Sequence, residues 1–262
     1  MYLAYWQLDR PAFENTPDPQ FFYLSRDHEE ALCRLSYAIQ NRKEAAMLTG
    51  EVGCGKSLIC QSLIKSLPVE TYNVAYISNP KYPPLDFLQA LLFHLGFEHE
   101  IPGKKMQIVA ALKKKIREEA EKGRHTVLIV DEAHTMDAEA LEETRLLLND
   151  QLPDRFIVTL VLVGQSSLKE PVGQNSPLDQ RVFLRYHLPA LSAEDTARYI
   201  AFRLERAGLK GNVFDDAAKE RIYEVSGGIP RRINIICALC LLVGQGARVN
   251  KIGSNIVNLV IE

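Results

Sequence analysis

The feature that most constrains this chain is a glycine-rich loop set between a short apolar run and a helical run. Residues 50–57 read GEVGCGKS, directly after the apolar segment 45–49 and directly before LICQSLI at 58–64. The glycines let the backbone wrap so that its N–H groups point at phosphate oxygens. Lys56 supplies a cation for the β and γ phosphates, and the Ser57 hydroxyl can bind Mg²⁺. The loop therefore predicts a nucleotide phosphate site made by Gly50, Glu51, Val52, Gly53, Cys54, Gly55, Lys56, Ser57 and Leu58.

A second motif supplies the carboxylates that hydrolysis needs. The apolar run 127–130 ends in Asp131 and Glu132. Asp131 can hold the magnesium through its water shell, while Glu132 can orient or deprotonate an attacking water. Two acids after a strand can also be plain solubilising residues, but here they follow a phosphate loop. The two motifs together predict Mg²⁺-dependent hydrolysis of ATP.

A polar side chain follows a further apolar run, at 157–163. If that strand neighbours the strand before Asp131, the amide of Gln165 lies beside the two carboxylates. There it can position the water or sense the γ phosphate; otherwise it is an ordinary loop residue. The role of Gln165 therefore depends on the order of strands in the sheet.

The wider pattern predicts two domains. Strands that are apolar throughout alternate with helical segments, which is typical of a parallel sheet covered by helices on both faces. We expect strands at 45–49, 74–78, 126–130 and 157–163, and helices at 84–95, 104–121 and 138–150.

After about Pro189 the strand signal stops. Ser192–Asp195 resembles a capping box that opens a helix through Arg206, and helical patterns follow at 215–225, 230–243 and 253–261. We therefore predict an α/β domain at 1–189, which includes an irregular N-terminal arm, and an all-helical lid domain at 190–262.

Composition limits the class of protein. The formal net charge of -2 gives no bulk attraction to nucleic acid or anionic lipid. The apolar run at 235–243 is far shorter than the roughly 20 residues of a membrane helix, so we expect a buried helix there. Because the N-terminus lacks a secretory signal, we expect a cytoplasmic chain with reduced cysteines. Cys237 and Cys240 lack further ligands nearby and are interpreted as buried thiols.

Taken together, these motifs resemble those of AAA+ ATPases. Two further features fit that resemblance: Arg181 in the sequence LDQR, and Arg231 in the sequence GIPR. More narrowly, the pattern YWQLDRPAFENTPDPQFFYLS at 5–25, followed by His28 and Ala31, resembles the general secretion pathway protein A group. Relatives of that group are linked to pilus, exosortase-type export and transposition systems.

The resemblance implies a P-loop NTPase fold with a helical lid, ATP and Mg²⁺ as cofactors, and a homo-oligomer, commonly a ring. In such a ring Arg181 is offered to the γ phosphate of a neighbouring subunit, and Arg231 reaches the phosphates from the lid. Arg181 can instead pair with Asp179 or another surface acid, and Arg185 is its nearest rival.

For function, the resemblance implies an ATPase that powers or regulates assembly of an envelope secretion, pilus or export machine. It would then work at the inner face of the membrane through a partner protein. A DNA-associated regulator of transposition is the alternative, and a nucleotide-gated scaffold with negligible turnover is a third possibility. Full-length secretion members continue into a membrane segment and a peptidoglycan-binding module. We therefore expect either an excised domain or a stand-alone relative.

Three further stretches are interpreted with this family in view. The sequence DEAH at 131–134 matches one helicase group, but no other helicase motif accompanies it, and we interpret His134 as a residue that couples the site to movement. The basic run 104–117 is followed at once by acids, so it is either a solvated helix face or a DNA groove. Pro230 starts a helix that carries Arg231, with Arg232 about 100° further round as a surface or partner contact.

Overall fold

The computed structural model describes residues 2–16, 18–97, 100–209 and 211–261; Pro17 of the N-terminal pattern and the last residue, Glu262, lie outside this description. The chain divides into two compact units. The α/β unit comprises the described residues of 28–50 and 59–188. The helical unit comprises those of 1–27, 51–58 and 189–262.

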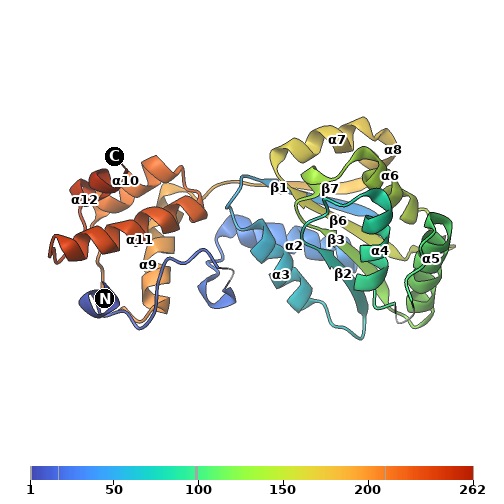
Figure 1. The fold of residues 1–262 in the computed structure, drawn as a ribbon, viewed down its shortest axis with the longest axis horizontal. Helices are drawn as coiled ribbons and strands as arrows, with labels where there is room; N and C mark the ends of the chain where they lie inside the picture. Colours follow the sequence, from blue (N-terminus) through green and yellow to red (C-terminus); the bar gives the residue numbers. More distant parts are fainter. Residues whose placement is uncertain (1, 17, 98–99, 210, 262) are drawn as a thin grey trace. The chain divides into compact units, whose positions relative to one another are not determined.

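The α/β unit is built on a five-stranded sheet in the order β2-β3-β6-β1-β7 (Figure 1). Each neighbouring pair is parallel. The strands are β1 (Ala45–Gly50), β2 (Tyr72–Ile77), β3 (His125–Val130), β6 (Val158–Gly164) and β7 (Val182–Leu188). The parallel sheet is therefore confirmed, and β1, β2, β3 and β6 match the predicted strands to within about two residues.

The sequence missed β7. Its residues, VFLRYHL, alternate between buried, half-buried and exposed positions because β7 is one of the two edge strands. An edge strand needs no continuous apolar run, so the signal that marked the central strands is absent here.

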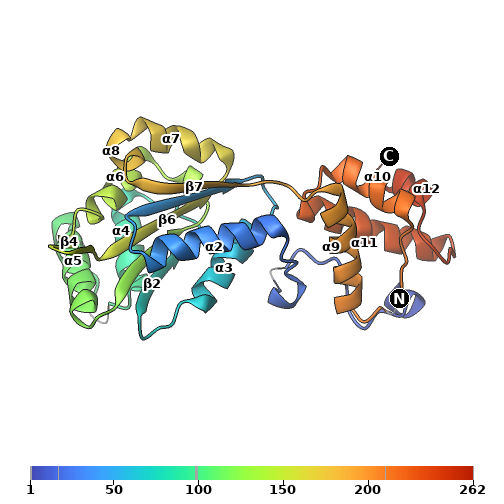
Figure 2. The same cartoon turned by 180° about the vertical axis from the view of Figure 1, so that it is seen from behind.

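Helices cover both faces of the sheet, as the all-apolar central strands require. In Figure 2, α2 and α3 lie across one face, whereas α4, α5 and α6 contact one another or the sheet on the other side. Alternate strand residues such as Met47, Leu128 and Leu160 join the core formed with α4, α5 and α6. The helices of this layer arrangement are α2 (Arg26–Gln40), α3 (Lys56–Ser66), α4 (Pro84–His94), α5 (Lys105–Glu121), α6 (Ala138–Leu147), α7 (Lys169–Gln174) and α8 (Ser176–Asp179). A short hairpin of β4 (Gln151–Leu152) and β5 (Arg155–Phe156) follows α6.

The helical unit contains α9 (Ala193–Arg206), α10 (Asp216–Ser226), α11 (Pro230–Gly246) and α12 (Ser254–Ile261). Local signals set their ends as predicted. The hydroxyl of Ser192 accepts a hydrogen bond from the backbone N–H of Asp195 at 3.0 Å, and Pro230 occupies the first turn of α11. Gly227, with φ 62°, ends α10 in the left-handed conformation.

The N-terminal arm packs into the helical unit (Figure 1, blue against α9 and α11). The arm contains α1 (Tyr2–Trp6) and the 3₁₀ turn η1 (Pro19–Phe21). The indole N–H of Trp6 donates to the Leu241 carbonyl at 2.8 Å. This grouping differs from the predicted division, which placed the arm with the α/β domain. An arm without periodicity does not reveal in its sequence which core receives its aromatic side chains.

The apolar run 235–243 lies within α11, as predicted, and Cys237 and Cys240 are confirmed as buried thiols. Burial raises the pKa of Cys240 to about 12 and that of Cys237 well above its ordinary value. The run is not buried throughout, however, because Ile235, Leu239 and Leu242 are exposed. Among the described helices, none combines the length and apolarity that crossing a bilayer requires.

Candidate nucleotide-binding site

The predicted phosphate loop starts where β1 ends, at Gly50, and leads directly into α3, whose first residue is Lys56. Gly53 and Gly55 take positive φ angles of 87° and 97°, which favour glycine. The ammonium of Lys56 is buried and donates to the carbonyl of Glu51 at 2.9 Å. The strand, loop and helix expected of a phosphate cradle are therefore all present.

Within the helical unit, the start of α11 rests on this loop. The backbone N–H of Arg231 donates to the Gly53 carbonyl at 3.3 Å. A Cβ atom at Gly53 would lie 2.6 Å from the Cβ of Arg231, so no larger residue fits there without displacement. The Arg231 side chain is exposed. Arg231 is thus held at the loop by its backbone while its guanidinium is accessible.

The two predicted carboxylates follow β3 in the α/β unit. Asp131 is buried; its Oδ1 accepts from the backbone N–H of Glu132 at 2.9 Å, and its Oδ2 accepts from the Tyr76 hydroxyl at 3.3 Å. Burial first, and then the negative charge of Asp131, raises the pKa of Tyr76, so its phenol keeps its proton. Sequence reasoning missed Tyr76, because only the pairing of β2 with β3 brings it to Asp131.

Glu132 has a φ of 53°, in the left-handed region that non-glycine residues rarely adopt. Such backbone strain clusters at functional sites. The next residues form a short 3₁₀ turn, η2 (Ala133–Thr135), and the Thr135 hydroxyl donates to the Glu132 carbonyl at 2.8 Å. The turn brings the side chain of His134 back toward that of Glu132.

Gln165 lies beside these residues because β3 and β6 are neighbours, as its predicted role required. Its amide end is 2.9 Å from His134 Nε2, and its backbone N–H is 3.4 Å from His134 Nδ1. His134 Nε2 is also 3.6 Å from the Glu132 carboxylate. The structure therefore brings together Glu132, His134 and Gln165 at the carboxyl edge of the sheet.

Arg181 lies at the opposite end of the strands, on their amino-terminal side. It immediately precedes β7, and its guanidinium pairs with Glu44, the residue before β1, at 3.3 Å and donates to Asn149 at 2.6 Å. Strands of six or seven residues separate that end from Gln165 by roughly 20 Å. Asp179, the acid predicted as the alternative partner of Arg181, pairs instead with Arg185 at 2.7 Å.

Comparisons with known proteins agree with this geometry. A family model described as an AAA domain matches residues 39–171. The general secretion pathway protein A of Aeromonas hydrophila is 35% identical over 256 residues, which are 96% of this chain and 46% of that protein. The chain thus spans about half the length of this curated relative.

Solved structures share the fold at low identity. The ORC2 protein of Aeropyrum pernix gives a TM-score of 0.71 at 18% identity, covering 97% of this chain and 71% of that one. The RuvB Holliday junction branch migration motor of Thermotoga maritima gives 0.57 at 20% identity, covering 90% and 68%. The family match and the shared fold support one conclusion: the chain belongs to the AAA domain family of ATPases.

Proposed function

We propose that this chain binds ATP with Mg²⁺, hydrolyses it as part of an oligomer, and thereby powers or regulates assembly of an envelope secretion, pilus or export machine. One observation carries the chemical part of this proposal. The phosphate loop begins at Gly50, the last residue of β1, and Asp131, Glu132 and Gln165 follow β3 and β6 in the same parallel sheet. The carboxyl ends of parallel strands share one edge of a sheet, where ligands of α/β proteins bind.

The residues present fit a magnesium nucleotide. Mg²⁺ prefers hard oxygen ligands, which the Ser57 hydroxyl and the Asp131 carboxylate supply, and the bound ion would neutralise charge on the β and γ phosphates. The loop backbone and Lys56 would hold those phosphates. Glu132 would orient and deprotonate the attacking water, and Gln165 would sense the γ phosphate.

The helical unit would add Arg231. Because its backbone is hydrogen-bonded to the loop at Gly53 while its side chain is exposed, its guanidinium has a phosphate site within reach of a long side chain. Charge-assisted bonds to a phosphate would then tie α11 to the nucleotide. Release of phosphate would loosen the same contact.

Arg181 would act on a second copy of the chain. From the edge of the sheet opposite Gln165, it cannot reach the carboxylates of its own chain without the sheet being rebuilt. A neighbouring subunit that docks on this edge would receive the guanidinium at its γ phosphate, where it would stabilise transition-state charge. The placement of Arg181 away from the carboxylates of its own chain supports the proposal of a homo-oligomer with shared sites.

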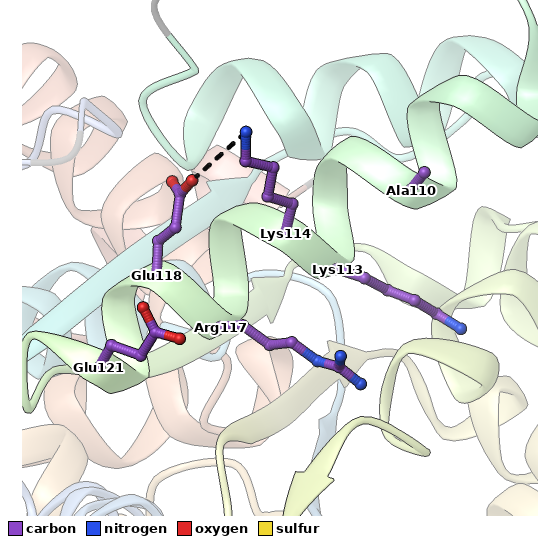
Figure 3. A pocket seen from close by; sticks show the side chains of 6 residues that line it. All are labelled: Ala110, Lys113, Lys114, Arg117, Glu118 and Glu121. Atoms are coloured by element: carbon purple, nitrogen blue, oxygen red, sulfur yellow. Dashed lines mark ion pairs between the residues drawn. The ribbon is translucent and has the colours of Figure 1, made fainter.

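The cellular role is taken from general secretion pathway protein A, the curated relative. The basic run on α5 offers little support for the alternative of DNA binding, because most of its cations are paired with acidic side chains. Lys114 lies 3.8 Å from Glu118, Lys115 lies 3.3 Å from Glu119, and Arg117 lies 2.6 Å from Asp150. Figure 3 shows Lys114 turned toward Glu118 beside the shallow hollow that Lys113 and Arg117 also line. These contacts favour a solvated helix face.

The decisive experiment measures nucleotide binding and ATP turnover separately in purified variants. Lys56→Ala is expected to abolish binding, whereas Glu132→Gln is expected to bind ATP and retain it unhydrolysed. Glu121→Gln, an exposed glutamate on α5, is the matched control and should keep parental turnover. Parental turnover in Glu132→Gln would refute the proposed chemistry. Stimulation of turnover by duplex DNA, and not by an envelope partner protein, would favour the transposition alternative.

A further inference from the structure

His134 lies between two groups that the proposed function uses, yet that function gives it no role. Its Nε2 atom is 2.9 Å from the amide end of Gln165 and 3.6 Å from the carboxylate of Glu132. The side chain is only 13% exposed, so these neighbours, more than water, are its hydrogen-bonding environment. It is therefore placed to respond to one of them and act on the other.

The hydrogen bonds identify where the ring carries its proton. The backbone N–H of Gln165 lies 3.4 Å from Nδ1 and can only donate, so Nδ1 accepts. In the neutral imidazole the proton then sits on Nε2. Because a protonated Nε2 donates and cannot accept, the Gln165 amide meets this N–H with its oxygen. One proton thus faces two acceptors, the Gln165 amide oxygen and the Glu132 carboxylate.

The backbone around the ring is shaped to allow this arrangement. A Cβ atom at Gly164, the last residue of β6, would lie 3.2 Å from both the backbone nitrogen and Nδ1 of His134. That contact is tighter than side chains ordinarily accept, so the absence of a side chain at Gly164 lets the ring approach the strand end. The left-handed backbone at Glu132 turns the chain so that residues 132 and 134 face each other.

We propose that His134 is a positioning residue, through which the location of the Gln165 amide controls the orientation of the Glu132 carboxylate. This inference rests on the ATPase function proposed above. When the Gln165 amide turns to the γ phosphate, the Nε2–H group loses its nearer acceptor and donates to Glu132. The carboxylate is then held in the orientation that activates water. When Gln165 returns, Glu132 is released, so hydrolysis is favoured only while the γ phosphate is sensed.

The test compares two substitutions at position 134. His134→Gln keeps an N–H donor at about the reach of Nε2, whereas His134→Asn is too short to do so. We expect His134→Asn to lower kcat about 10- to 100-fold with unchanged ATP affinity, because only orientation is lost. His134→Gln should recover most of that loss. His94→Asn, at an exposed histidine on α4, is the matched control and should keep the parental kcat.

If His134 acts together with Gln165, substitutions at the two positions should not have independent effects. The kcat of the double variant His134→Asn/Gln165→Ala should be no lower than that of the slower single variant, since both substitutions remove the same coupling. A double variant whose kcat falls by the product of the two single-variant reductions would overturn the inference. Full activity in His134→Asn, alongside an inactive Glu132→Gln, would overturn it and leave the ATPase proposal intact. Parental turnover in Glu132→Gln would instead refute the ATPase chemistry itself.

A measurement on the unaltered chain keeps the inference testable if a variant fails to fold. Nitrogen-15 NMR of the six histidine side chains, with His134 assigned from the spectrum of His134→Gln, reports the protonated ring nitrogen. We expect a proton on Nε2 and none on Nδ1, with a change in the Nε2 signal when a non-hydrolysable ATP analogue replaces ADP. A proton on Nδ1, or a signal indifferent to the γ phosphate, would overturn the inference.

Discussion

At the scale of single residues, the sheet contains a titratable group that the proposed chemistry does not use. His125, the first residue of β3, is buried, and its Nε2 lies 2.8 Å from the Thr159 hydroxyl. That hydroxyl donates to the Lys43 carbonyl at 2.6 Å, so it accepts from a neutral His125. Burial, reinforced by the positive charge of Arg42, lowers the pKa of His125 to about 4. Protonation of this ring therefore opposes folding.

This shift predicts an acid-sensitive α/β unit. A histidine whose folded pKa is about 4 and whose unfolded pKa is 6.5 contributes stability that is complete above pH 6.5 and lost as the pH falls toward 4. Between pH 7.5 and pH 5 the loss from this group is about 2 kcal/mol. Urea unfolding at both pH values should show this loss in the parental chain and not in His125→Gln. An equal loss in His125→Gln would contradict the assignment to this ring.

Gly53 provides a second test at this scale. Its positive φ and the 2.6 Å approach of Arg231 to its absent side chain mean that Gly53→Ala must distort the loop. Strain of this kind costs about 1–3 kcal/mol, so we expect ATP affinity to fall by roughly tenfold or more, measured by titration with a fluorescent nucleotide. Gly173→Ala is the control, because a Cβ atom there meets nothing within 4 Å. Unchanged affinity in Gly53→Ala would show that the loop does not hold the phosphates as proposed.

At the scale of elements, one buried cation holds the N-terminal arm against α9. The guanidinium of Arg203 donates to the carbonyls of Ala12 at 2.6 Å and Glu14 at 2.9 Å, and it lies 4.7 Å from the centre of the Phe21 ring. The Tyr199 hydroxyl also accepts from it, at 3.0 Å. Arg203 therefore supplies hydrogen bonds to backbone carbonyls of an irregular segment, which strand pairing would otherwise have to provide.

Removal of this cation should release the arm. Arg203→Ala removes the donor to the carbonyls of buried Ala12 and of Glu14, and we expect the helical unit to lose about 2–4 kcal/mol of stability, since bonds to charged groups are worth more than neutral ones. Limited proteolysis should cut the arm faster, and urea unfolding should report the lost stability. Glu205→Ala, at an exposed position of the same helix, should change neither. Equal protection of the arm in both variants would contradict the role of Arg203.

At the scale of the whole molecule, the proposal requires a second copy of the chain. Arg181 precedes β7, at the amino ends of the strands, and the carboxylates follow β3 at the carboxyl ends, so a site that uses both would need two subunits. Mixing Arg181→Ala with Lys56→Ala should then restore part of the ATPase activity, because each variant supplies what the other lacks. Mixing Glu132→Gln with Lys56→Ala should restore none. No recovery in the first mixture, with assembly intact by light scattering, would contradict a finger in trans.

Arg185, the rival arginine, is distinguished by the same assay. It is more exposed than Arg181 and pairs with Asp179 on its own chain. If Arg185→Ala, and not Arg181→Ala, is rescued by Lys56→Ala, the finger is Arg185. The two candidates thus give opposite results in one experiment.

The amino-acid sequence alone determined the features that depend on neighbours in the chain. The strand, loop and helix around Lys56, the acids after β3, the cap at Ser192 and the helix start at Pro230 were all predicted. Each depends on hydrogen bonds, dihedral angles or apolar periodicity within a few residues, which a single sequence displays directly.

Only the tertiary structure decided what packing brings together. The pairing of β3 with β6 placed Gln165 against His134, the parallel direction of β6, β1 and β7 put Arg181 and Gln165 at opposite strand ends, and the arm's aromatic residues joined the helical core. These contacts join residues separated by many positions in the chain. Their choice depends on which surfaces exclude the most water and leave the fewest polar groups unpaired, and that is a property of the whole fold.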